Sequence, residues 1–219
     1  TKPFASFLPG ISGLWGIPMW AFYVNRGQAI AGFGIQDKDH PIMEFLPANR
    51  AYRSVALHGF RTFLKLGPAK RPVFYEPFQT PRSDDRSSAR QRMRIRMHDL
   101  MLEENHPRFG LEVRVHYFTI PHEPFAALAR TVTITNRSRK TLDLELLDGL
   151  PAIIPYGMLD RFLKQMSRTI EAWVAVHGVE QRTPFFQLKV EPDDRPEVVP
   201  IQAGNFYVGC TEDDGRPRL

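Results

Sequence analysis

Alternation of apolar and polar residues is the clearest pattern in the middle of the chain. Between residues 111 and 117 every second side chain is apolar, and Glu112, Arg114 and His116 stand between them. Because successive side chains of a strand point to opposite faces, this pattern predicts a strand with one buried and one wet face. Similar patterns predict strands at 92–102, 129–136 and 142–146, the first forming a long hairpin with 111–120. The spacing favours an antiparallel β-sandwich.

The N-terminal part also reads mostly as strands. Segments 14–25 and 28–34 predict two strands around a turn at Arg26 and Gly27, and 47–57 predicts a short helix. Residues 37–40 then fall on a loop, and loops on a rigid sheet often carry binding groups. Residues 70–88 contain prolines and serines, which indicates an exposed connection.

One segment has the apolar spacing of a helix rather than that of a strand. At 159–177 the apolar residues recur at helical spacing, and Gly178 follows where a C-terminal cap belongs. We predict a helix of about five turns there. Its apolar stripe is typical of a core or an interface rather than of a ligand site. The stripe comprises Leu159, Phe162, Leu163, Met166, Ile170, Trp173 and Val174.

Composition bounds the class of protein. With 219 residues, 42% of them hydrophobic and 24% charged, the chain suits one ordinary globular domain, 1–219. No apolar run reaches the roughly 18 residues of a membrane span. The single cysteine, Cys210, excludes an internal disulfide framework and fits a reducing compartment, so we expect a cytoplasmic protein that does not cross a membrane.

The net charge of +5 has its densest source in one arginine run, Arg82, Arg86, Arg90, Arg92, Arg94 and Arg96. As a strand, 90–97 would place its arginines on one face and its apolar side chains on the other. No exposed aromatic residues alternate with these arginines, which argues against nucleic-acid binding. A solvated or ion-paired face is favoured over an anionic ligand or an acidic partner.

The candidate chemistry lies in the loop formed by Asp37, Lys38, Asp39 and His40, which follows a segment rich in aromatic rings. Rings beside carboxylates suit a sugar, which offers apolar C–H faces and hydroxyl groups. The alternative is a loop whose hydrogen bonds fix its own turn. The sequence contains no nucleophile elbow, P-loop, dinucleotide fingerprint or helical histidine pair, so it predicts neither a catalytic nor a metal residue.

Several long stretches resemble one enzyme group. Segment 4–65, with GLWGIPMWAFYVNRGQAIAGFGIQDKDHPIMEF, and the later ALARTVTITNRSRKTLDLELLDGLPAIIPYGM, MSRTIEAW and GNFYVG occur in the same order as in that group. They resemble the N-terminal region of the glycoside phosphorylases related to cellobiose phosphorylase and β-1,3-glucan phosphorylases, in glycoside hydrolase families 94 and 161.

The resemblance implies a mainly β fold, namely a large antiparallel β-sandwich (super-sandwich) of the galactose-mutarotase-like type with one inserted α-helix. It implies an N-terminal accessory and interface domain, inactive alone, with the catalytic α/α barrel absent from this chain. The intact enzyme would perform inverting phosphorolysis of β-glucosides such as cellobiose, with inorganic phosphate as co-substrate and no cofactor.

Partners follow from the same resemblance: a carbohydrate, the catalytic barrel and a second copy in a homodimer, without nucleic acid or membrane. In related dimers this domain can lend loop residues to the partner's active site. Arg26, Asp37, Lys38, Asp39 and His40 are therefore the candidate residues for sugar contact or for the interface, and no residue takes a catalytic role.

Two alternatives remain open. A stand-alone aldose-1-epimerase-like mutarotase would need an acid and a base, for which His122 with Glu123 or Asp39 with His40 could serve. Neighbours on a strand point to opposite faces, which argues mildly against both pairs. A carbohydrate-binding module would need Trp15, Trp20 or Trp173 exposed in a groove, whereas the helical stripe predicts a buried Trp173.

Overall fold

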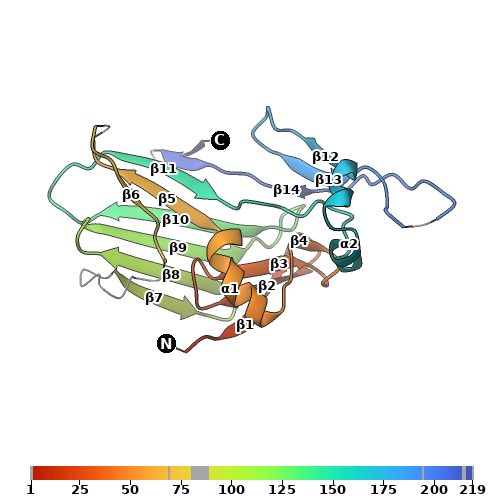
Figure 1. Ribbon diagram of the computed structural model, residues 1–219, viewed down its shortest axis with the longest axis horizontal. Helices are drawn as coiled ribbons and strands as arrows, with labels where there is room; N and C mark the ends of the chain where they lie inside the picture. The colour runs from red at the N-terminus through yellow and green to blue at the C-terminus, as the bar shows by residue number, and fades with distance from the viewer. Residues whose placement is uncertain (1, 69, 80–88, 194, 214–215, 219) are drawn as a thin grey trace. The chain divides into compact units, whose positions relative to one another are not determined.

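The computed structural model describes residues 2–68, 70–79, 89–193, 195–213 and 216–218. The chain divides into two compact units where the sequence predicts one domain. Unit 1 comprises Thr1–Phe33 and Phe45–Pro151, and unit 2 comprises Gly34–Glu44 and Ala152–Leu219. The architecture is mainly β with antiparallel sheets, as predicted (Figure 1).

Unit 1 holds three sheets and a helix. The first sheet contains β1 (Ala5–Ser12), β2 (Ile17–Val24) and β3 (Ile30–Ile35), whose last residues enter unit 2. The second has the order β10 (Leu128–Asn136), β9 (Leu111–Thr119), β8 (Asp99–His106) and β7 (Arg90–Ile95). The third has the order β11 (Leu144–Gly149), β5 (Arg61–Leu66) and β6 (Val73–Tyr75).

The alternating pattern of β9 is realised in unit 1. Val113, Val115 and Tyr117 are buried, whereas the polar residues between them are partly exposed. The Tyr117 hydroxyl donates a hydrogen bond of 2.9 Å to the Gln28 carbonyl oxygen, which joins the second sheet to the turn before β3. The buried face of β9 therefore packs inside a sandwich-like unit, as the period of two requires.

A partly buried ion pair lies beside this core. Arg130 on β10 donates to both carboxylate oxygens of Asp148 on β11, at 2.5 and 2.9 Å. The same guanidinium also donates to the side-chain oxygens of Gln28 and Thr62, at 2.5 and 3.0 Å. Because each polar group has a partner, the network connects the second and third sheets to the turn before β3 and leaves none of its charges unpaired.

Helix α1 (Ala48–His58) confirms the helix predicted at 47–57. Its Ala51 and Val55 are buried against Phe22 and Val24 of β2. Pro47 stands just before the first turn, where its missing N–H costs nothing, and its carbonyl oxygen accepts from Ala51 N at 2.9 Å. Among the described residues, no helix is long and apolar enough to span a membrane.

Two predictions in unit 1 need correction. The strand predicted at 92–102 is divided between β7 and β8, because Arg96 N donates to Asp99 O at 2.9 Å and closes a turn. The connection predicted at 70–88 contains β6, which pairs with β5. Residues 80–88 lie outside the described part of the chain, and so do Arg82 and Arg86.

Unit 2 contains the short strand β4 (Pro41–Met43) and a small sheet of β12 (Val174–His177), β13 (Phe185–Leu188) and β14 (Asn205–Phe206). A last hairpin joins β15 (Thr211–Asp213) to β16 (Arg216–Arg218). The core of the unit is built from Met158, Phe162, Ile170 and Leu188.

The helix predicted at 159–177 is wrong in extent. The structure has α2 (Asp160–Gln165), then a 3-10 helix (Ser167–Trp173), and then β12. Met166 N still bonds to Phe162 O at 2.9 Å, but Val174 is already extended. The apolar residues serve the core of unit 2 through three elements, and Trp173 is 37% exposed rather than buried.

Candidate functional site

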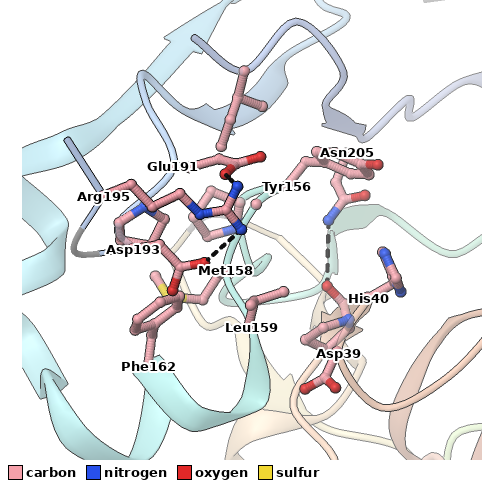
Figure 2. Close-up of a pocket in the computed structure, with 15 residues that line it drawn as sticks. Asp39, His40, Tyr156, Met158, Leu159, Phe162, Glu191, Asp193, Arg195 and Asn205 are labelled. Carbon is pink, nitrogen blue, oxygen red and sulfur yellow. Dashed lines mark hydrogen bonds and ion pairs between the residues drawn. The ribbon is translucent and has the colours of Figure 1, made fainter. Parts of the chain in front are cut away.

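The candidate site is an open cavity of about 220 Å³ within unit 2. Figure 2 shows charged and amide side chains arranged around apolar residues. The walls come from the loop before β4, from the segment that leads into α2, and from the stretch between β13 and β14. The lining residues are Asp39, His40, Pro41, Pro155, Tyr156, Gly157, Met158, Leu159, Phe162, Glu191, Pro192, Asp193, Arg195, Ile201 and Asn205.

The loop before β4 is a tight turn that fixes its own conformation. Gly34 is required at its base, because a Cβ there would lie 2.4 Å from the carbonyl oxygen of His40. Asp37 Oδ1 accepts from Asp39 N at 2.8 Å and lies 2.9 Å from His40 Nδ1. The hydrogen bond with His40 holds the pKa of the Asp37 carboxyl below its ordinary value.

A second set of contacts ties this loop to α2. Lys38 Nζ and Lys164 Nζ lie 2.9 and 2.5 Å from the same oxygen of Asp160, whose side chain is buried. Asp160 N in turn donates to Asp39 Oδ1 at 3.2 Å. Hydrogen bonds from Lys164, and then from Lys38, lower the pKa of Asp160, and the bond with Asp160 raises the pKa of Lys38. The backbone of the loop is thus held against the first turn of α2.

The back of the cavity is formed where the chain runs beside β13. Tyr156 N donates to Phe186 O at 3.1 Å, and Leu188 N donates to Tyr156 O at 2.9 Å. Gly157 has a φ of 92°, a left-handed conformation that glycine adopts readily. The Asn205 amide donates to Ile154 O at 2.8 Å and to Pro41 O at 3.3 Å, so one side chain links three walls of the cavity.

The opposite side of the cavity is a charged rim. Arg195 lies 3.4 Å from a Glu191 oxygen and 3.2 Å from Asp193 Oδ2, and Figure 2 shows its guanidinium between the two carboxylates. Arg161 also pairs with Asp193. Asp39 lies across the cavity from Arg195 (Figure 2).

This arrangement suits binding better than acid–base chemistry. Glu191 and Asp193 are already paired with arginine, and His40 is hydrogen-bonded to Asp37 rather than to Asp39. The walls nevertheless present carboxylate and guanidinium groups beside aromatic rings. Such a set can accept and donate hydrogen bonds to a ligand with many hydroxyl groups and can pack on its apolar faces.

The five residues named from sequence have different positions. Asp39 and His40 line the cavity, whereas Asp37 and Lys38 hold the loop. Arg26 belongs to unit 1, where it donates to Tyr52 O at 3.2 Å and lies over the Tyr52 ring at 5.6 Å. The pair His122 and Glu123 is exposed and also belongs to unit 1.

Sequence reasoning missed Tyr156, Glu191, Asp193 and Arg195. They come from segments more than 100 residues beyond the loop, and no short motif connects them to it. Two of the quoted stretches do reach the cavity, since the one that ends in IIPYGM contains Tyr156 and GNFYVG contains Asn205. Polar residues beside prolines, as at 191–195, are typical of an ordinary loop, so the sequence alone gives them no special weight.

No group of three or more histidine, cysteine, aspartate or glutamate side chains could hold a metal ion within the part of the chain that the structure describes. No model of a known protein family matches this sequence, and no curated protein matches it significantly.

Proposed function

We propose that this chain is the N-terminal accessory and interface domain of an inverting glycoside phosphorylase that acts on β-glucosides. In this proposal the unit 2 cavity contacts the carbohydrate, while a catalytic α/α barrel supplies the acid and binds inorganic phosphate. The proposal includes a cytoplasmic homodimer. The observation that carries it is the cavity itself, which Asp39, Arg195 and Asn205 line together with Tyr156.

Sugar recognition explains why these residue types occur together. A pyranose presents several hydroxyl groups that both donate and accept, so carboxylate, guanidinium and amide groups can each contact it. Its C–H faces pack on aromatic rings such as Tyr156. A cavity of about 220 Å³ is small for a drug-sized ligand and is closer in size to one sugar ring.

The test is a titration of the chain with cellobiose, laminaribiose and longer β-glucans, in which binding is measured by calorimetry and by saturation-transfer NMR. We expect weak binding, with a dissociation constant on the order of 1 mM. Asp39→Asn keeps the acceptor for Asp160 N but removes the charge, so it should weaken binding about tenfold without loss of fold. Asp143→Asn, an exposed residue of unit 1, is the matched control and should bind as the parent does.

A second assay addresses the accessory role. The chain is incubated with disaccharide and phosphate, and sugar phosphate is measured; we expect none. Sugar-phosphate formation by this chain alone would refute the accessory role. Absence of binding to every β-glucoside, or equal affinity in Asp39→Asn and the parent, would refute the carbohydrate contact.

A carbohydrate-binding module is favoured by a different observation. Trp15 is 87% exposed in the turn between β1 and β2, and Trp20 on β2 is also exposed, edge-to-face with Phe7 at 6.5 Å. Exposed rings are the stacking platforms that such modules use. Trp15→Ala with Trp20→Ala should abolish retardation of the chain in a glucan-containing gel if this hairpin binds sugar, whereas Asp39→Asn should not.

A further inference from the structure

A second hollow, of about 390 Å³, lies on unit 1 and plays no part in the carbohydrate proposal. It covers one face of β7, β8 and β9, which lie side by side in the second sheet (Figure 1). Its outward side chains include five arginines and two glutamates: Arg90, Arg92, Arg94, Arg114, Arg137, Glu103 and Glu112, with Asn105 among them.

Strand register brings these residues together. Arg92 is opposite Glu103, and Glu103 is opposite Arg114, so the three form one row across the sheet. In the next row Asn105 stands between Arg90 and Glu112. Because side chains two apart on a strand share a face, both rows point into the same hollow.

The two carboxylates lie deep and are each shared by two arginines. Glu103 is 19% exposed and lies 3.2 Å from Arg94 and 3.4 Å from Arg114. Glu112 is similarly covered and lies 3.3 Å from Arg114 and 3.0 Å from Arg137. The guanidiniums of Arg94 and Arg137 stay at least half exposed above them. Negative charge is therefore at the bottom of the hollow and positive charge at its rim.

Charge is unbalanced in this hollow. Five guanidiniums face two outward carboxylates, an excess of three positive charges. Glu104 also borders the hollow, but its carboxylate is buried and accepts a hydrogen bond from Gln91 at 2.8 Å. If Glu104 is counted as charged, the excess is still two positive charges. Arg90 and Arg92 have no carboxylate within ion-pairing distance among the described residues. Guanidinium forks match the oxygens of a tetrahedral oxyanion.

We propose that this hollow is a binding site for a phosphate group, with Arg90 and Arg92 as the principal ligands and Arg94, Arg114 and Asn105 around them. Two sources share that chemistry, inorganic phosphate and a phosphate monoester such as a sugar phosphate. Single-stranded nucleic acid fits less well, because the residues that line the hollow include no aromatic ring on which a base could stack.

The test measures thermal stabilisation and calorimetric binding with sodium phosphate, pyrophosphate, glucose 1-phosphate and glucose, each against sodium chloride of equal ionic strength. We expect saturable binding of the phosphate compounds, tighter for pyrophosphate, and none of glucose. Arg90→Gln with Arg92→Gln should weaken it about tenfold or more. Arg53→Gln, an exposed arginine on α1, is the matched control and should change it less than about twofold.

The outcomes separate clearly. Equal affinity for inorganic phosphate and glucose 1-phosphate, with binding of both lost in the double variant, supports a site that recognises the phosphate group alone. Binding of glucose 1-phosphate but not of inorganic phosphate, again lost in the double variant, assigns the site to a phosphate monoester. A phosphate effect that chloride reproduces, or one that survives in the double variant with native circular dichroism, overturns the proposal. None of these results depends on whether unit 2 binds a sugar.

Discussion

Glu104 should give this protein an unusual dependence of stability on pH. Its side chain is 2% exposed on the buried face of β8. Oε2 accepts hydrogen bonds from Phe78 N at 2.7 Å and from Gln91 at 2.8 Å. Oε1 has no hydrogen-bond partner among the described residues. Burial raises the pKa of Glu104 from 4.5 to about 7, and the hydrogen bond from Phe78 offsets only part of that increase.

The sign follows from proton linkage. Between pH 4.5 and about 7 the folded protein holds a proton that the unfolded chain has lost, so the free energy of unfolding falls as pH rises through this window. The complete change is about 3 kcal/mol as an upper bound. Glu104→Gln keeps an oxygen acceptor for Phe78 N and cannot ionise. The variant should therefore be about 2 kcal/mol more stable than the parent at pH 8 and about equal to it at pH 4.5.

The assay is urea unfolding at pH 4.5, 6 and 8, combined with hydrogen exchange at the amides of β8, which reports unit 1 by itself. A gain of 2 kcal/mol would raise the thermal midpoint by roughly 4–8 °C. Glu103→Gln is the control, because Glu103 faces outward between two arginines and its loss should give no gain at pH 8. The reasoning is refuted if Glu104→Gln is no more stable than the parent at pH 8, or if both lose stability equally from pH 4.5 to 8.

Three further changes have outcomes that unfolding experiments can measure. Arg130→Met leaves the partly buried Asp148 without its guanidinium and should cost about 2 kcal/mol, whereas Arg130→Met with Asp148→Leu should recover much of that loss. A double variant as unstable as the single one would contradict this. Gly157→Ala should destabilise unit 2 by about 2 kcal/mol in thermal unfolding, because φ is 92° at this position and the new Cβ would collide with Ile201. Unchanged stability in this variant would argue against the left-handed turn. Asp160→Asn should lower the free energy of unfolding by about 1 kcal/mol at pH 7. The difference from the parent should shrink as pH falls below 3.8, because the pKa of Asp160 is lowered and its ion pairs stabilise the fold only while it is charged. A difference that is constant with pH would exclude the ion pairs as its cause.

Periodicity predicted the strands that have one buried face. The alternation at 111–117 became β9 with its apolar residues buried, because burial on a single face fixes the register. The same rule failed at 92–102, where Arg96 and Asp99 pair at 3.1 Å and turn the chain without glycine or proline. The helical spacing at 159–177 also misled, since the core of unit 2 takes its apolar residues from α2, the 3-10 helix and β13.

The candidate cavity was only partly predictable for a different reason. The loop at 37–40 could be placed from local turn signals, and two of its residues line the cavity. The residues that complete the walls lie at 155–162 and 191–205 and arrive through tertiary contacts such as those of Asn205. Local patterns carry no information on such contacts, so the sequence yields the loop but not its opposite wall.

Glu103 and Glu104 show how strongly strand alternation decides the chemistry of a side chain. They are the same residue type on adjacent positions of β8, yet one lies between two guanidiniums and the other faces the core with Leu100 and Leu102. The alternation could have revealed this in advance, because Leu100, Leu102 and Glu104 share one parity along the strand. A shift of β8 by one residue would bury Glu103 and turn Glu104 outward in its place, so the two carboxylates would exchange environments. The register of β8 therefore decides which of the two acids is buried and which one lies among the arginines, and variants at Glu104 and at Arg92 test it from opposite faces of the same sheet.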